Sequence, residues 1–128
     1  MLRLVSRSIL DLAVPAWQGA LIVAQKLDIE RVQKGALHII LGEQYENYTH
    51  ALKLTNLEKL ENRRVELCYR FAKKCEKNDK HKHWFVNKPS LFTRQKPQRY
   101  KTVIARTDRL KKSPICYLTE LLNKHHQK

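Results

Sequence analysis

The chain has 128 residues and a mass of 15.2 kDa, which is the size of one ordinary domain. Hydrophobic residues make up 42% of it, with only three glycines and four prolines, which excludes a collagen-like, low-complexity or wholly disordered protein. Lysine and arginine number 26 against 12 aspartates and glutamates, so the formal net charge is +14. This excess favours polyanionic partners.

The positive charge is concentrated in the second half of the sequence. Residues 1–60 hold seven basic and six acidic groups, a net of +1, whereas residues 61–128 hold 19 basic and six acidic groups, a net of +13. We therefore expect the first half to supply the core and the second half to supply a basic surface.

Three cysteines, Cys68, Cys75 and Cys116, are an odd number, and no convincing secretory signal precedes them. A disulfide framework is therefore not expected, and an intracellular, nuclear or cytoplasmic protein is favoured over a secreted one. The longest stretch without a charge, residues 12–25, is shorter than the roughly 20 residues that a membrane span needs. No membrane partner is predicted.

Two helices are expected in the first 42 residues. Apolar spacing predicts one over residues 4–14, and Pro15 should end it because proline disfavours helix in the residue before it. The arginines and serines at this end also overlap with mitochondrial presequences, but Asp11 favours a buried first helix. The next helix is amphipathic and stops at Gly42. Its predicted core-facing stripe contains Ile22, Ile29, Val32, Ala36, Ile39 and Ile40.

Capping signals predict two further helices. Thr49 is expected to cap a short helix that contains Ala51, Leu52 and Leu54. Thr55 and Glu58 have the spacing of a capping box, so a long helix should start there and fray by residue 78. Its predicted apolar face contains Leu57, Leu60, Leu67, Cys68, Phe71 and Cys75.

Residues 79–112 contain Pro89, Pro97 and isolated aromatic residues without a clear period, which indicates an irregular basic arm. Ser113 and Pro114 are typical of a helix start, and the helix should end near Asn123. Its apolar face, which is expected to dock on the helical core, contains Ile115, Leu118, Leu121 and Leu122, and His125 and His126 are expected in a frayed tail. We therefore predict an all-α fold with a helical subdomain over residues 1–78, a basic arm over 79–112 and a C-terminal helix with its tail over 113–128.

The sequence shows no enzymatic centre. Its four aspartates are isolated from one another, so the clustered carboxylates of two-metal phosphoryl transfer are not found, and there is no glycine-rich phosphate loop. Cys68 and Cys75 with His81 and His83 have zinc-binding side chains, but seven helical residues separate the two sulfurs by about 10 Å. Core cysteines and surface histidines are favoured, and no catalytic residue, metal or cofactor is predicted.

Basic residues interleaved with aromatic ones remain as the strongest pattern. Basic groups displace counterions from phosphates and exposed rings stack on unpaired bases, so RNA or single-stranded DNA is the expected partner. The alternative is a solvated basic face with the aromatic rings in the core. The candidate nucleic-acid contacts are Arg63, Arg64, Arg70, Lys73, Lys74, Trp84, Phe85, Arg106, Arg109, Lys111 and Lys112.

Several segments follow one another in a recognisable order. They are SILDLAVPAW at residues 8–17, IERVQKGALHIILG at 29–42, YTHALKL at 48–54, LEKLENRR at 57–64, KHKHWF at 80–85, ARTDR at 105–109 and SPICYLTELLN at 113–123. The first resembles the run just beyond the polymerase palm in reverse transcriptases of jockey-like non-LTR retrotransposons. The others resemble the helices and terminal segment that follow in these enzymes.

The resemblance implies a post-palm, thumb-like tail of an RNA-directed DNA polymerase from a transposable element, which would help to hold template and primer. Leu12 and Val14 depart from the family, which usually has an aromatic residue and a cysteine there, and the palm's Tyr-x-Asp-Asp motif is not in this sequence. We therefore expect a fragment that does not synthesise DNA by itself. The alternatives are a helical protein-interaction module, whose apolar surface at residues 15–17 or in the last helix originally faced the palm, and a basic amphipathic segment on a membrane surface.

Overall fold

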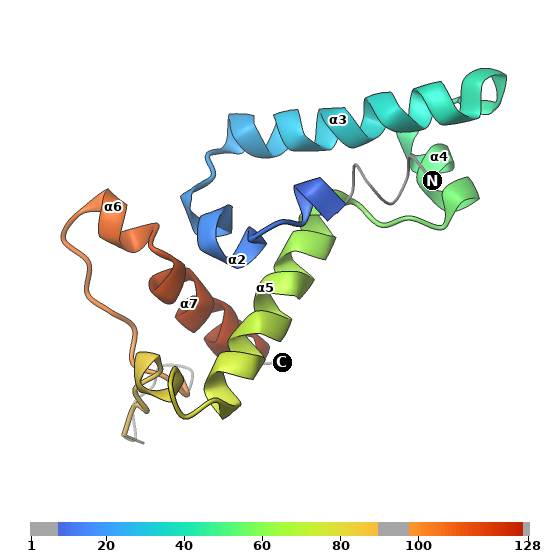
Figure 1. The fold of residues 1–128 in the computed structure, drawn as a ribbon. Helices are drawn as coiled ribbons and strands as arrows, with labels where there is room; N and C mark the ends of the chain where they lie inside the picture. The colour runs from blue at the N-terminus through green and yellow to red at the C-terminus, as the bar shows by residue number, and fades with distance from the viewer. Residues whose placement is uncertain (1–7, 90–97, 127–128) are drawn as a thin grey trace. The chain divides into compact units, whose positions relative to one another are not determined.

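The computed structural model describes residues 8–89 and 98–126. Helices dominate this part of the chain, as Figure 1 shows, and its one β-type pairing is an isolated antiparallel bridge between Asn87 and Tyr100. After a helical turn at 8–10, the elements are α2 (Val14–Trp17), η1 (Gln18–Ala20), α3 (Val23–Leu41), η2 (Gly42–Gln44), α4 (Tyr48–Thr55), α5 (Leu60–Lys77), η3 (Lys82–Trp84), α6 (Asp108–Lys111) and α7 (Pro114–His126). The predicted all-α fold is confirmed.

The chain forms two compact units. The first unit comprises Met1–Leu12 and Leu21–Glu66, and the second comprises Ala13–Ala20 and Leu67–Lys128. Helices α3 and α4 belong to the first unit, whereas α2, α6 and α7 belong to the second. Helix α5 contributes its first seven residues to the first unit and its remaining 11 to the second. The predicted division at residues 78 and 112 stays a prediction.

Polar side chains that are buried or part buried join the three helices of the first unit. The Gln33 side chain donates from Nε2 to the Tyr48 hydroxyl and to the carbonyl oxygen of Glu58, at 3.1 Å each. The Glu30 carboxylate of α3 accepts from the Tyr48 hydroxyl and, at 3.3 Å, from the backbone N–H of Leu60. The start of α5 is therefore capped from another helix, which satisfies one of the backbone donors that every helix leaves open.

The apolar core of the first unit is small and lies next to these polar groups. Leu37, Ala51 and Leu52 are its buried members. The predicted core-facing stripe of α3 is wrong at most of its positions: Ile39 is 83% exposed and Val32 is also exposed, whereas Ile29 and Ala36 are part buried. The buried residues of α3 are Gln33 and Leu37, four positions apart, because the helix turns its hydrogen-bonding face toward α4 and the start of α5.

The ends of α3 and α4 confirm one sequence signal and correct two. Gly42 ends α3 with a left-handed φ of +51°, as predicted. The cap of α4 is Asn47, whose Oδ1 accepts from the backbone N–H of His50 at 2.8 Å, and not Thr49. Thr55 starts no capping box, because its hydroxyl donates to the carbonyl oxygen of Ala51 at 2.7 Å and closes α4. Asn56 then adopts a left-handed conformation, and α5 begins only at Leu60.

The segment around Pro15 corrects another prediction. Pro15 lies in the first turn of α2, so it opens a helix there and does not end one. The first backbone N–H groups of a helix have no hydrogen-bond partner within that helix. Proline fits this turn because it lacks only such an N–H. The helical turn at 8–10 is separate from α2, and residues 4–7 of the predicted first helix lie outside the described residues.

The second unit is built around α7. This helix begins at Pro114 as predicted and buries Leu118, Leu121 and Leu122, whereas Ile115 is part exposed. It runs on through His126, and the His125 ring stacks on Tyr69 of α5 with centroids 4.1 Å apart. The prediction of a frayed tail at His125 and His126 is therefore wrong, because an aromatic contact on α5 holds the last turn.

Helix η1 passes α7 at very short range. A Cβ at Gly19 would lie 2.8 Å from the Cβ of Tyr117 and 3.1 Å from the carbonyl oxygen of Lys112. Only glycine permits this approach, so the α2–η1 segment packs directly on the start of α7. Across residues 8–89 and 98–126, no helix has the length and hydropathy that crossing a bilayer requires.

We expect Gln33→Ala to lower the free energy of unfolding by about 1–3 kcal/mol, because two hydrogen bonds are lost and the groups that made them are left near the core. Urea unfolding monitored by circular dichroism measures the change. Lys34→Ala, at the exposed neighbouring position of the same helix, is the matched control and should leave the stability nearly unchanged. Equal effects of the two substitutions would contradict the polar junction.

Candidate nucleic-acid interface

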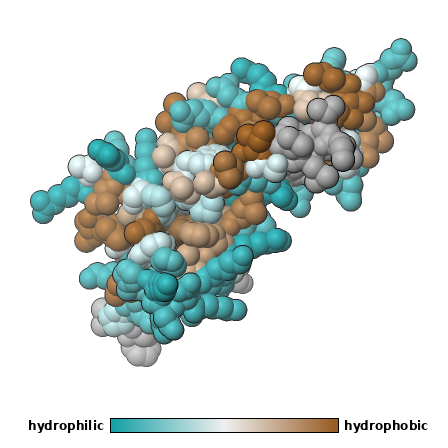
Figure 2. Space-filling view, in the orientation of Figure 1, coloured by the Kyte–Doolittle hydropathy of each residue, from teal (hydrophilic) through white to brown (hydrophobic). Residues whose placement is uncertain are grey.

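Three exposed cations form a basic stripe on the outer face of α5 in the second unit. Arg70, Lys74 and Lys77 are exposed and have i, i+4, i+7 spacing, which places them on one face of the helix. The buried residues Cys68 and Ala72 lie on the opposite face. Figure 2 shows hydrophilic side chains where the second half of α5 lies in this view. Arg70 and Lys74 thus occupy the exposed positions that a phosphate contact requires.

Lys73, the other basic residue of α5 in the second unit, is paired with a carboxylate of the same helix. Glu76 pairs with Lys73 at 3.3 Å and with Nη2 of Arg99 at 2.9 Å, and its side chain is mostly buried. The Lys73 ammonium also lies over the Tyr69 ring, 5.8 Å from the centroid. Lys73, a predicted phosphate contact, is therefore engaged inside the unit.

Glu76 also accepts a hydrogen bond from the Tyr100 hydroxyl. Burial works to raise the pKa of Glu76, but the hydrogen bonds from Tyr100 and Lys73 and the positive charges of Lys73 and Arg99 outweigh it and lower the pKa. Burial, together with the hydrogen bond and negative charge of Glu76, raises the pKa of Tyr100 to about 12. A charged carboxylate and a protonated phenol thus join α5 to the segment around residue 100.

Asn123 of α7 holds the same segment through its backbone. Its side-chain Oδ1 accepts from the N–H of Tyr100 at 2.9 Å, and its Nδ2 donates to the carbonyl oxygen of Tyr100 at 3.0 Å. Two backbone hydrogen bonds join this segment to residues 86–88. The backbone N–H of Lys88 donates to the carbonyl oxygen of Arg99 at 3.0 Å, and the backbone N–H of Lys101 donates to the carbonyl oxygen of Val86 at 2.8 Å. Part of the predicted irregular arm is therefore pinned by specific backbone hydrogen bonds.

The two aromatic candidates have different environments. Phe85 is 7% exposed and packs against Tyr100 with ring centroids 5.6 Å apart, so it is a core residue, which is the alternative that the sequence left open. Trp84 is only half-buried, and its ring lies 4.5 Å from that of His81 and 6.2 Å from that of His83. Trp84 keeps a surface on which a base could stack.

Two predicted phosphate contacts in the first half of α5 contribute to the fold instead, one by being buried and the other by forming an ion pair. Arg64 is 1% exposed, so its guanidinium does not lie on the surface and its prediction as a phosphate contact is corrected. The Nε of Arg63 donates to Oδ2 of Asp11 at 2.6 Å. The sequence showed both arginines only as basic residues of the long helix, and it could not reveal Asp11, 52 positions away from Arg63.

The four basic candidates near α6 all lie on the surface. Arg106, Arg109, Lys111 and Lys112 are exposed. Lys111 lies 3.8 Å from Asp108, a solvent-exposed pair that is worth little because water screens it. Thr107 caps α6, since its hydroxyl accepts from the backbone N–H of Leu110 at 3.4 Å. The cap fixes the helical turn that presents these cations.

The cysteines contribute to packing. Cys68, Cys75 and Cys116 form no disulfide and all three are buried, as the favoured sequence interpretation predicts. Burial raises the pKa of the Cys75 thiol, which keeps it protonated. In the part of the chain that the structure describes, no three His, Cys, Asp or Glu side chains come together as a metal site would require.

The division into two units also divides the charge. The residues of the first unit include nine basic and eight acidic groups, whereas those of the second include 17 basic and only four acidic groups. The net charges are therefore +1 and +13. Lys77 and Lys101 add exposed cations that the predicted set left out, and the i, i+4, i+7 spacing with Arg70 and Lys74 was a sequence signal for Lys77.

No protein-family model matches the chain, and searches of curated proteins and of solved structures find no significant match. The resemblance to retrotransposon reverse transcriptases therefore rests on the sequence segments alone.

The Tyr100 pair makes stability depend on pH in the alkaline range. The unfolded chain releases the tyrosine proton near pH 10, whereas the folded chain keeps it until about pH 12. The stabilisation is therefore complete below pH 10 and is lost as the pH rises through about 12. We expect the difference in unfolding free energy between the natural chain and Tyr100→Phe to shrink by on the order of 2 kcal/mol over this range.

Urea unfolding at a series of pH values from 9 to 12 measures this difference. Because lysines titrate in both proteins, the comparison isolates Tyr100. If the difference in unfolding free energy between the two proteins stays constant with pH, then Tyr100 has the same pKa in the folded and unfolded chain, which would contradict the prediction.

Proposed function

We propose that this chain is a helical module that binds single-stranded RNA or DNA through its phosphates. The observation that carries the proposal is the net charge of +13 in the second unit, together with exposed cations on α5 and around α6. Only four acidic groups are available in that unit, and Glu76 already holds two cations. Most of the positive charge therefore stays open to an external polyanion.

The proposed role is to hold a strand in place and not to act on it chemically. Phosphate contacts from lysine and arginine supply affinity that does not depend on sequence, and the partly exposed Trp84 supplies a stacking surface for an unpaired base. In the context implied by the sequence resemblance, the chain is the post-palm tail of a non-LTR retrotransposon reverse transcriptase. There it would help to hold template and primer.

Phosphate binding by the stripe predicts a measurable dependence on salt. Replacing Arg70, Lys74 and Lys77 with Glu should weaken binding to single-stranded RNA by at least about tenfold at low salt. The slope of log affinity against log salt should become shallower by about two, since each lost phosphate contact on a single strand removes about 0.7. Fluorescence anisotropy with a labelled oligonucleotide over a salt series measures both quantities.

A triple variant of the first unit provides the matched control. Lys34, Lys53 and Lys59 are exposed, and replacing all three with Glu changes the net charge by the same amount. This control should retain most of the affinity and the salt slope, and circular dichroism should show the same helicity in both variants. Equal losses in the two variants would mean that only net charge matters, and unchanged binding in both would overturn the proposal.

A second candidate function is supported by the exposed apolar side chains of α3. Val23 is 73% exposed and Leu27 is 61% exposed, and Figure 2 shows apolar side chains along this helix. Exposed apolar surface of this kind is typical of protein-binding helices, including one that would face a polymerase palm. Binding to such a partner should be almost insensitive to salt, which separates this function from nucleic-acid binding.

A further inference from the structure

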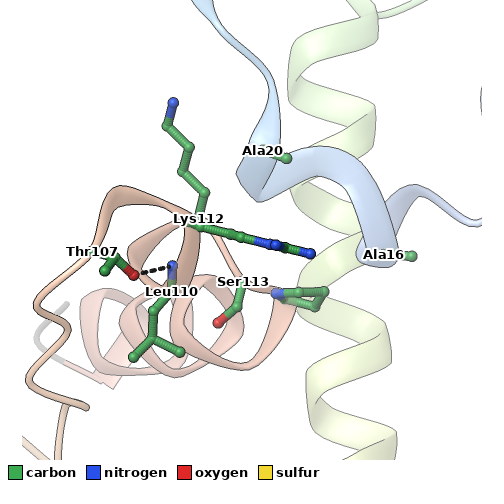
Figure 3. A pocket seen from close by; sticks show the side chains of 8 residues that line it. Ala16, Ala20, Thr107, Leu110, Lys112 and Ser113 are labelled. Carbon is green, nitrogen blue, oxygen red and sulfur yellow. Dashed lines mark hydrogen bonds between the residues drawn. The ribbon is translucent and has the colours of Figure 1, made fainter.

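A pocket of about 560 Å³ lies between η1, α6 and the start of α7, entirely within the second unit. Its apolar lining comes from Ala16, Ala20, Leu110 and Pro114, and its two cations are Arg109 and Lys112. Figure 3 shows Ala16 and Ala20 on the α2–η1 segment, across from Leu110, Lys112 and Ser113. The volume is within the range of roughly 300–1,000 Å³ that is typical of small-molecule sites.

Contacts on both sides give the pocket a defined shape. Gly19 brings η1 to α7, where a Cβ would lie only 3.1 Å from the carbonyl oxygen of Lys112. On the other side, the Thr107 cap holds the single turn of α6. The small side chains of Ala16 and Ala20 then leave space where larger residues would fill the gap between these two walls.

The two cations of the pocket are not neutralised within the described part of the chain. There, neither Arg109 nor Lys112 forms an ion pair, whereas Lys111 between them has Asp108 as a partner at 3.8 Å. Arg109 lies in α6 and Lys112 is the C-cap residue of that helix, and both line the pocket. A bound ligand with a negative charge would therefore meet positive charge at the pocket wall.

We propose that this pocket takes one nucleotide unit of a bound single strand, a proposal that rests on the proposed function. The ring system would pack on the apolar walls, and the phosphate would be held by the guanidinium of Arg109 and the ammonium of Lys112. A small inorganic anion would make no favourable contact with the apolar walls. An uncharged hydrophobic ligand would make no ion pair with the two cations. A nucleotide combines both features.

The direct test is a titration of the full chain with adenosine 5′-monophosphate, followed by amide chemical shifts in NMR. The largest shifts should fall on Ala20, Leu110 and Ser113, and adenosine or inorganic phosphate alone should bind at least about tenfold more weakly, because each carries one of the two required features. Equal binding of inorganic phosphate would overturn the proposal. Tighter binding of a short-chain phosphatidic acid would assign the pocket to a lipid and would also overturn it.

Two variants separate the pocket from general charge. Ala20→Leu fills the pocket without changing charge and should abolish the nucleotide-induced shifts. Lys112→Gln should weaken nucleotide binding by about tenfold, whereas Lys111→Gln, the matched control on the same turn, should change it less than twofold. If Ala20→Leu does not fold, Arg109→Gln at an exposed position provides the same test as Lys112→Gln. If the folded variants of Ala20, Arg109 and Lys112 bind the nucleotide with unchanged affinity, the proposal that this pocket binds it is overturned.

The outcome for the pocket is distinguishable from that for the proposed function. Ala20→Leu keeps the basic stripe of α5, so single-stranded RNA binding should stay strongly salt dependent while the affinity falls by a few fold. If the natural chain binds RNA but Ala20→Leu binds it equally well, the pocket proposal fails and the proposed function stands. If the natural chain shows no salt-dependent RNA binding, the proposed function fails and the pocket proposal fails with it.

Discussion

The Glu30 carboxylate joins three helices of the first unit at one point. It accepts from the Tyr48 hydroxyl of α4 and from the first N–H of α5, while Gln33 of the same helix donates to Tyr48 and to the chain just before α5. Buried polar groups lose their bonds to water, so they stabilise a structure only when they find partners like these. The orientation of α3 follows from this junction more than from its most apolar stripe, which is why side chains such as Ile39 face solvent.

The second unit uses polar contacts in a similar way. Glu76 gathers Lys73, Arg99 and Tyr100 around one carboxylate, and Asn123 holds the backbone of Tyr100 as a neighbouring strand would. Through these contacts, a few charged and polar side chains hold the irregular segment around residue 100 in place. The cations outside them, on the outer face of α5 and around α6, are exposed, and it is these that the proposed function assigns to phosphates.

The basic residues therefore form two groups, those that contribute to the fold and those that remain exposed. The sequence alone does not distinguish the two groups. Arg63 is engaged by Asp11, Arg64 is buried, and Lys73 is engaged by Glu76, so these side chains contribute to the fold. Arg70, Lys74 and the four cations near α6 remain exposed. Trp84 and Phe85, although adjacent, separate in the same manner, with Phe85 in the core and Trp84 partly at the surface. The nucleic-acid proposal depends on the exposed group alone.

Local chemistry was enough to predict the all-helical class, the stop at Gly42, the start of α7 at Pro114 and the uneven charge. These features depend on residues close together in the sequence, where spacing and backbone preference act directly. Tertiary structure alone decided which face of α3 is buried, where α5 begins and which arginines stay exposed. Each of these depends on a partner distant in the chain, such as Glu30 for Leu60 or Asp11 for Arg63. A periodic pattern shows that a side chain is polar, but only the folded chain brings to it the group that it binds.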